Sequence, residues 1–278
     1  MDAAEKRELE ITACKVRIGI IEGVHSAKSG HPGGSLSCAD ILTYLYFKHM
    51  NIDSKNPKAD NRDRFVLSKG HAAPALYSVL ANRGYFDVSE LNKLRHIGSM
   101  LQGHPDMKHI PGVDMSSGSL GQGISAAVGM ALSSKHFGSG FKVYTVLGDG
   151  EIEEGQVWEA AMFAGNKKLS NLTAFIDYNN LQIDGTIEEV NSAMPIDKKF
   201  EAFNWHTIVI DGHDFEQIEA ALKEAETVDK PVAIIANTVK GKGVSYMENA
   251  VNWHGAAPND ELYEQAVSEL NAALKALQ

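Results

Sequence analysis

The sequence has 278 residues, of which 44% are hydrophobic and 22% are charged, so it contains enough apolar material for a buried core. Lys and Arg number 26 and Asp and Glu number 36, which gives a formal net charge of −10 and argues against a nucleic-acid partner, since nucleic acids are bound by basic surfaces. The two cysteines cannot supply a disulfide framework. No secretory signal and no run of roughly 20 apolar residues is present, so we expect a soluble, cytoplasmic protein without a membrane partner.

The first half of the chain combines helical patterns with glycine-rich breaks. The segment SGHPGGS at 29–35 interrupts a helical pattern, and eight glycine or proline residues over 98–123 predict a long loop. A loop of that length in a compact domain is usually functional or disordered. Apolar residues that recur every three or four positions predict helices, and a short apolar run predicts a buried strand. The predicted helices cover residues 9–24, 41–45 and 73–81, and the strand covers residues 64–68.

The second half of the chain alternates between predicted strands and helices. The strands are apolar runs rich in β-branched residues, at 143–147, 172–176, 206–210 and 232–236. The helices have periodic apolar residues, at 124–132, 155–167, 218–222 and 262–277. Such alternation is typical of a parallel sheet that is buried on both faces. We therefore expect residues 1–278 to form a single α/β domain, with a mainly parallel sheet of about five or six strands and helices on both faces.

Polar residues follow two of these strands. GDG at 148–150 comes directly after one strand, and NN at 179–180 follows the next strand along the chain. Ligands of parallel sheets bind at the carboxyl ends of the strands, and glycine lets backbone amides approach a phosphate closely. Asp149 and Asn179 offer the hard oxygen atoms that Mg²⁺ or Ca²⁺ prefers. GDG by itself is equally compatible with a tight turn, but the two motifs together predict a phosphate and metal site.

Six further segments point to a family. They are KSGHPGGSLS at 28–37, FVLSKGHAAPALY at 65–77, LQGHPD at 101–106, SSGSLGQG at 116–123, LGDGEIEEGQVWEAA at 147–161 and KGKGVSYMENAVNWHG at 240–255. In this order they resemble transketolase, a thiamine diphosphate enzyme that transfers a two-carbon ketol unit from a ketose to an aldose. Deoxyxylulose-phosphate synthase shares the first segment and the GDG motif, but it lacks SKGHA in this form. The resemblance implies the thiamine diphosphate-binding fold.

The resemblance also implies two cofactors, thiamine diphosphate and Mg²⁺, with Ca²⁺ as an alternative metal. The side chains of Asp149 and Asn179 and the carbonyl of Leu181 match the metal ligands of the family. Gly150 matches a residue whose backbone meets the diphosphate. Other positions match residues that line or approach the cofactor, namely Lys69, His71, Gly118, Leu120, Lys240 and His254. A simpler interpretation of Lys240 is an exposed basic loop.

Histidines next to glycine form a second group of candidates. They are His31, His71, His104, His213 and His254. The resemblance implies that all except His213 face the reacting sugar or its channel. Breaking the C2–C3 bond of a ketose requires removal of the C3 hydroxyl proton, and an imidazole titrates in the range needed for that transfer. Structural alternatives are GHP turns at His31 and His104 and a helix cap at His71, and we expect His213 to order a turn after a strand.

Two glutamates match residues at the subunit interface of the family. Glu154 and Glu159 lie near the start of the helix predicted over 155–167, and the resemblance implies that Glu159 faces its counterpart or the catalytic glutamate of the neighbouring chain. A purely structural explanation is available, because acidic residues are favoured near a helix N-terminus by the helix dipole. Both glutamates remain candidates for the cofactor site.

The resemblance covers only the N-terminal, diphosphate-binding half of transketolase. The pyrimidine-binding domain and its activating glutamate come later in that family's chain. We therefore expect one subunit of a split transketolase, completed by a separate C-terminal subunit in an α2β2 assembly that acts on sugar substrates. Two alternatives stay open. The first is a split thiamine diphosphate enzyme of another specificity, either a transketolase for modified or sulfonated sugars or an enzyme similar to deoxyxylulose-phosphate synthase. The second is a non-catalytic thiamine diphosphate-binding protein. The candidate histidines count against the last, because binding the cofactor does not require them all.

Overall fold

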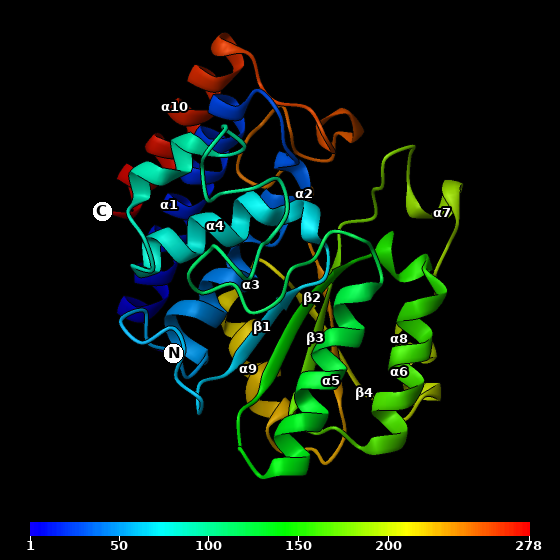
Figure 1. Ribbon diagram of the computed structural model, residues 1–278. Helices are drawn as coiled ribbons and strands as arrows, with labels where there is room; N and C mark the ends of the chain where they lie inside the picture. Colours follow the sequence, from blue (N-terminus) through cyan, green and yellow to red (C-terminus); the bar gives the residue numbers. More distant parts are fainter.

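A five-stranded parallel sheet forms the centre of the computed structural model, which describes residues 1–278 (Figure 1). The strands are β1 (Arg64–Leu67), β2 (Val143–Gly148), β3 (Leu172–Tyr178), β4 (His206–Asp211) and β5 (Val232–Asn237). Their order across the sheet is β1-β2-β3-β5-β4, and every neighbouring pair is parallel. Each of the five predicted strands is therefore confirmed.

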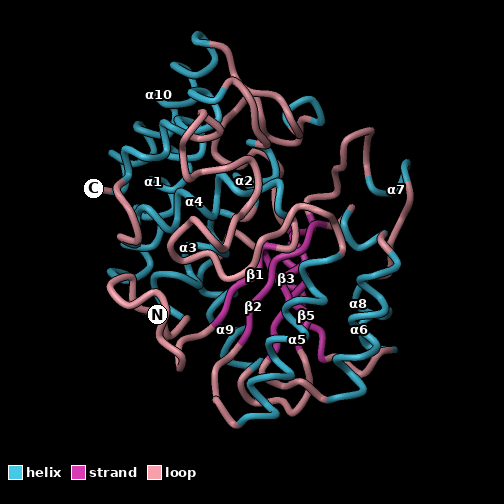
Figure 2. Tube along the Cα trace, viewed as in Figure 1, coloured by secondary structure: helices cyan, strands magenta, loops and turns pink.

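Helices cover both faces of the sheet (Figure 2). One side carries α1 (Ala3–Ala27), α3 (Ala39–Tyr44), α4 (Ala73–Arg83) and α9 (Phe215–Ala225), with α10 (Asp260–Leu277) packed on α1. The other side carries α5 (Gln122–Phe137), α6 (Gly155–Lys167) and α8 (Ile196–Ala202).

The two sides form separate apolar cores. In β2, Tyr144 and Val146 belong to the core beneath α1 and α4, whereas Val143 and Leu147 belong to the core beneath α5 and α6. Successive side chains of a strand point to opposite faces, so a strand between two helical layers needs apolar residues at every position. This requirement explains the continuous apolar runs in the sequence.

The structure differs from the prediction in several short regions. The glycine-rich segment at 29–35 contains the start of a helix, α2 (Pro32–Ser37), because a proline in the first turn has no N–H that would be left unpaired. The π-helix η1 (Leu45–His49) extends α3, and α7 (Ile187–Val190) and α8 were not predicted. Strand β4 is the edge of the sheet and is only partly buried, with Val209 58% exposed.

The long loop predicted over 98–123 is irregular but ordered by packing, and it ends where α5 begins. Leu101 and Ile110 from this loop are at most 2% exposed and belong to the larger core. The remaining short elements are the 3-10 helices η2 (Gly70–Ala72), η3 (Val88–Lys93), η4 (Glu151–Glu153) and η5 (Val251–Trp253). Cys14 and Cys38 are buried and unpaired. None of the helices combines the length and apolar character needed to cross a membrane.

Candidate active site

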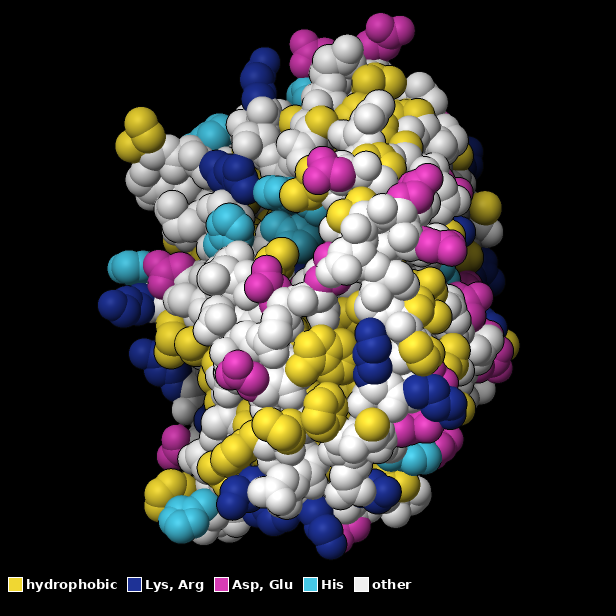
Figure 3. Space-filling model, turned by 90° about the vertical axis from the view of Figure 1, so that its right-hand side faces the viewer, with side chains coloured by type: hydrophobic (Ala, Val, Ile, Leu, Met, Phe, Trp, Pro, Cys, Tyr) yellow, Lys and Arg dark blue, Asp and Glu magenta, His cyan; other side chains and the backbone are white.

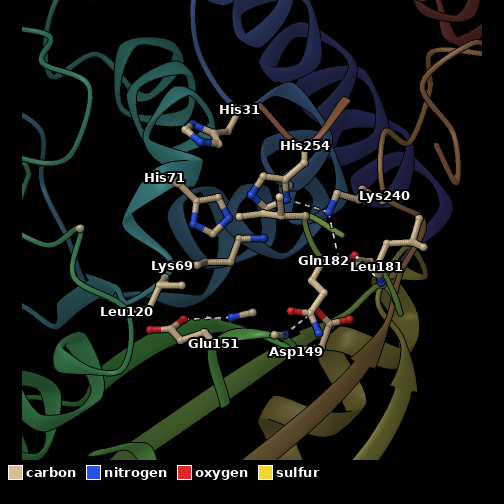
Figure 4. Close-up of a pocket in the computed structure, with 16 residues that line it drawn as sticks. His31, Lys69, His71, Leu120, Asp149, Glu151, Leu181, Gln182, Lys240 and His254 are labelled. Carbon is tan, nitrogen blue, oxygen red and sulfur yellow. Dashed lines mark hydrogen bonds between the residues drawn. The ribbon is translucent and has the colours of Figure 1, made fainter. Parts of the chain in front are cut away.

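A pocket of about 240 Å³ lies at the carboxyl ends of β2 and β3 (Figure 4). It gathers residues from loops that are far apart in the sequence, and it includes all the predicted site residues except His104, Glu154 and Glu159. Its lining residues are His31, Gly34, Lys69, His71, Gly118, Leu120, Gly148, Asp149, Gly150, Glu151, Asn179, Leu181, Gln182, Ile183, Lys240 and His254.

The turn after β2 is held by a glutamate that was not predicted from the sequence. Glu151 is 2% exposed, and its carboxylate accepts hydrogen bonds from the backbone N–H groups of Gly148 (3.0 Å) and Gly121 (2.9 Å) and from the hydroxyl of Ser68 (2.5 Å). Burial raises the pKa of Glu151, although the three hydrogen bonds act in the opposite direction. Glu151 thus ties together three loops around the pocket.

Asp149 is a buried carboxylate that forms no ion pair. It is 3% exposed, and its oxygens accept hydrogen bonds only from the backbone N–H groups of Gly150 (2.9 Å) and Asn180 (2.6 Å). Burial, with Asp177 adding to it, raises the pKa of Asp149 to about 7. An uncompensated buried carboxylate is costly, and a bound cation relieves that cost. Asp149 therefore fits a metal site.

Two other oxygen donors face the same pocket. The Asn179 side chain is 7% exposed, and the carbonyl of Leu181 accepts a hydrogen bond from Nζ of Lys240 at 2.9 Å. No three His, Cys, Asp or Glu side chains lie close enough together to hold a metal ion by themselves. The available donors are one carboxylate, one amide and one main-chain carbonyl, a set of hard oxygens that suits Mg²⁺ if phosphate oxygens complete the coordination.

Lys240 is buried in the wall of the pocket rather than exposed on a basic loop. The residue is 1% exposed, and its ammonium group lies 2.9 Å from the Leu181 carbonyl and 3.0 Å from Nδ1 of His254. Burial lowers the pKa of Lys240 to about 8, while Asp149 acts in the opposite direction. Its charge is therefore directed into the pocket, where an anionic group would compensate it.

A second lysine lies at the floor of the pocket. Lys69 forms a fully buried ion pair with Asp177 of β3, and Asp177 also accepts hydrogen bonds from the hydroxyls of Ser37 (2.6 Å) and Thr238. Burial would raise the pKa of Asp177, but Lys69 outweighs it and holds the pKa below its usual value. This cluster fixes β3 to the loops that follow β1 and β5.

Three histidines form a triangle at the top of the pocket (Figure 4). The ring centroids of His31, His71 and His254 are 5.3 to 5.5 Å apart. Burial is the main cause that lowers their pKa values, to about 4 for His31 and about 3 for His254, and the pKa of His71 also lies well below 6.5. All three imidazoles are therefore neutral at pH 7, so each can donate one hydrogen bond and accept another.

His104 lies beside the pocket, behind a glycine. Its carbonyl accepts a hydrogen bond from the Tyr77 hydroxyl at 2.8 Å, and its ring contacts Gly118, where an added Cβ would lie 3.0 Å from the ring. Gly118 also touches Gly70, because a Cβ on Gly70 would lie 2.6 Å from the Gly118 nitrogen. Two loops therefore cross at this point with room only for glycine.

Glu154 and Glu159 lie outside the pocket in this chain. Both are exposed, at the start of α6 and one turn into it. Exposed apolar side chains are present at the pocket, in Leu120 and Ile183, and on α6, in Met162 and Phe163. Figure 3, which views the side of α5 and α6, shows hydrophobic side chains gathered below a hollow in which histidines are visible. Neither glutamate lines the pocket that this chain forms by itself.

Comparison with known proteins agrees with the fold. The model of the transketolase, thiamine diphosphate binding domain family matches residues 9–274. A 6-deoxy-6-sulfo-D-fructose transketolase subunit SqwG from Clostridium sp. (strain MSTE9) is 47% identical over 264 residues, which is 95% of this chain and 96% of the relative. An apulose-4-phosphate transketolase subunit from Phocaeicola vulgatus is 42% identical over 271 residues, which is 97% of this chain and 96% of the relative.

A solved structure extends this agreement to three dimensions. The crystal structure of transketolase from Campylobacter jejuni superposes with a TM-score of 0.90 at 34% identity, and the match covers 100% of this chain but only 46% of that chain. The five-stranded parallel sheet with helices on both faces is thus the thiamine diphosphate-binding fold. The chain belongs to the transketolase thiamine diphosphate-binding domain family.

Proposed function

We propose that residues 1–278 act as one domain that binds thiamine diphosphate and Mg²⁺ in the pocket at the ends of β2 and β3. Asp149, Asn179 and the Leu181 carbonyl would hold the metal, Gly150 would meet the diphosphate through its backbone, and Lys240 would compensate its charge. The observation that carries the proposal is the convergence of these residues, from separate segments of the chain, on one pocket. The donor set fits the metal because the buried Asp149 carboxylate has no other cation.

The chemistry follows from the histidines above this site. Thiamine diphosphate, when bound, supplies the electron sink for cleaving the C2–C3 bond of a ketose. A neutral imidazole of His31 would accept the proton of the C3 hydroxyl, and His71 and His254 would donate hydrogen bonds to the oxygens of the sugar. The ring of His254 has its proton on Nε2, because its Nδ1 accepts from Lys240. Such acid–base assistance contributes about 10²–10⁴ in rate. His104, which lies against Gly118, would reach the sugar from the side of the pocket. The proposed reaction is transfer of a two-carbon ketol unit to an aldose.

We propose further that the chain works as one subunit of a split transketolase. The two relatives described above are each covered over 96% of their length, and their names describe them as transketolase subunits. The exposed apolar side chains at the pocket (Leu120 and Ile183) and on α6 (Met162 and Phe163) would suit contact with a protein partner. A separate C-terminal subunit in an α2β2 assembly would supply the pyrimidine-binding half, and Glu154 and Glu159 would then contribute from the interface.

The names of the relatives favour a more specific candidate, a transketolase for a modified sugar. One relative is named for 6-deoxy-6-sulfo-D-fructose and the other for apulose 4-phosphate. This chain is 47% and 42% identical to them, so both sugars are reasonable donors to test.

The test is co-expression with candidate pyrimidine-binding subunits, followed by an assay of ketol transfer. The donors are xylulose 5-phosphate, 6-deoxy-6-sulfo-D-fructose and apulose 4-phosphate, each with a series of aldose acceptors. We expect negligible turnover by the chain alone and restored turnover in the mixture. Full turnover by the isolated chain would refute the split-subunit proposal. Tight cofactor binding without turnover in any combination would favour a non-catalytic protein.

A further inference from the structure

His213, predicted from the sequence to order a turn, takes part in a buried cluster behind the pocket. It follows β4, and its backbone N–H donates to the Asp211 carboxylate at 2.8 Å, so the predicted turn is present. Its ring makes two additional contacts. Nδ1 lies 2.7 Å from the carboxylate of Asp40, and Nε2 accepts a hydrogen bond from the backbone N–H of Val239 at 2.9 Å.

Asp40 connects this histidine to an arginine on α1. The Asp40 carboxylate accepts hydrogen bonds from both terminal nitrogens of Arg17, one of them at 2.9 Å, and all three side chains are at most 14% exposed. Burial would raise the pKa of Asp40, but Arg17 and His213 outweigh it and lower the pKa to about 2. Nε of Arg17 also donates to the carbonyl of Lys242 at 3.1 Å.

The cluster therefore holds both ends of the segment Val239–Lys242. His213 fixes the N–H of Val239 and Arg17 fixes the carbonyl of Lys242, and Lys240 lies between these two points. In the middle of the segment, the N–H of Gly241 donates to the Gly33 carbonyl at 3.0 Å. The backbone on either side of Lys240 is thus fixed by groups that do not themselves line the pocket.

We propose that Arg17, Asp40 and His213 act as a clamp that positions Lys240 toward the diphosphate site, an inference that rests on the function proposed above. The hydrogen bonds define the state of the ring. Because Val239 donates to Nε2, that nitrogen carries a lone pair, and the single proton of the neutral ring lies on Nδ1 and is donated to Asp40. A second proton on Nε2 would face the Val239 N–H and release that end of the segment.

Several elements pack against the His213 ring, and each contributes titratable or charged groups. Glu10, Cys14 and Arg17 of α1 line the same cavity as His213, together with Asp40 of α3 and Lys242. Asp211, from the turn that carries His213, faces its backbone N–H. Of these groups only Asp40 contacts Nδ1, and no acidic side chain contacts Nε2, so the clamp depends on the Nε2 lone pair.

Two substitutions of His213 separate the two contacts of the ring. The side-chain amide of asparagine reaches the position of Nδ1, so His213→Asn keeps a donor for Asp40 and removes the acceptor for Val239. The amide of glutamine reaches the position of Nε2, so His213→Gln keeps an acceptor for Val239.

The first measurement is amide hydrogen exchange of the full chain by NMR, expressed as protection factors. His213→Asn is expected to lower the protection of Val239 by at least about tenfold and to lower that of Gly241 as well, since one hydrogen bond is lost. His213→Gln is expected to stay close to the original protein. The amide of Val146 in β2 is the control, and its protection should change in neither variant.

The second measurement couples the clamp to the lysine. In the enzyme assembled with its partner subunit, His213→Asn should weaken the binding of thiamine diphosphate with Mg²⁺ by about tenfold, and the same substitution should have almost no effect in a Lys240→Ala background. Equal effects in both backgrounds would refute the positioning of Lys240. Unchanged protection of Val239 in His213→Asn would refute the clamp itself. An assembled enzyme that binds no thiamine diphosphate would refute the proposed function while leaving the exchange result intact.

Discussion

Replacing Lys69 with methionine tests the buried ion pair beneath the pocket. The side chains of Lys69 and Asp177 are 1% and 0% exposed, and the substitution leaves Asp177 charged and buried with only neutral partners, namely the hydroxyls of Ser37 and Thr238 and, at 3.4 Å, the side-chain amide of Asn179. Removing one member of a buried pair costs about 3–5 kcal/mol. The hydrogen bonds from Ser37 and Thr238 stay in place, so we expect a loss near the lower end of this range, about 3 kcal/mol in the free energy of unfolding. For a chain of this size that corresponds to a fall of roughly 6–12 °C in Tm.

Urea unfolding at pH 7.5 measures this loss, with Lys198→Met as the matched control. Lys198 pairs with Glu201 at 2.9 Å on the surface, where its side chain is 64% exposed, so the control should lose less than about 0.5 kcal/mol. The pKa of Asp177 is held down and that of Lys69 is raised by their pairing, which outweighs burial in both cases. The stabilisation from Asp177 is thus present above pH ~4 and that from Lys69 below pH ~10, and the difference between variants should persist from about pH 5 to pH 9. A loss below about 1 kcal/mol for Lys69→Met, or equal losses for both variants, would contradict this reasoning.

Four other results can be predicted from the site and the packing. Asp149→Ala should abolish Mg²⁺-dependent binding of thiamine diphosphate, because the carboxylate is the one charged oxygen donor of the proposed metal site; an unchanged calorimetric affinity would remove it from that site. His104→Ala should lower turnover by a factor of about 10²–10⁴. It should lower cofactor affinity by much less, since the His104 ring lies outside the pocket lining. A turnover equal to that of the original enzyme would show that the role of His104 is structural. Gly165→Ala should destabilise the chain by several kcal/mol, because the added Cβ would lie 1.7 Å from a carbonyl oxygen. Gly129→Ala, on the open side of α5, should instead stabilise the chain by about 0.5–1 kcal/mol. Chemical unfolding of both variants compares the two effects. Burial lowers the pKa of His31 to about 4, so below pH ~6.5 the unfolded chain binds more protons than the folded chain, and stability should fall from pH 6.5 to pH 5. In His31→Asn, the fall of Tm over this pH range should be shallower. An identical dependence of Tm on pH in both proteins would count against a buried neutral ring.

The strands and the strand-end residues could be predicted because their signals are local. A run such as VYTVL and the GDG that follows it are contiguous, so Asp149 and its position at the edge of the sheet can be derived from neighbouring residues. The helix α2 was missed because its glycines favour a loop, whereas packing around a proline in its first turn determines the outcome. Local propensity was overruled there by tertiary contacts.

The polar residues that hold the site together could not be predicted in the same way. Asp177 lies at the end of an apolar strand, and its partner Lys69 is 108 residues earlier in the chain. Glu151 shares its short segment with exposed acids such as Glu154, and only the fold shows which carboxylate turns inward. The role of His213 likewise depends on Asp40, 173 residues away. The separation of such pairs in the sequence does not reveal that they are in contact, because the order of strands in the sheet determines which residues lie close together in space.

The crossing of Gly70 and Gly118 has a consequence for how this pocket can diversify during evolution. A side chain at position 70 would collide with the backbone of the other loop, and one at position 118 would press on the ring of His104. Neither position can therefore take a side chain that would reshape the cavity. Changes in the shape of this pocket must come instead from lining residues that have side chains, such as Gln182 and Ile183 in the loop after β3.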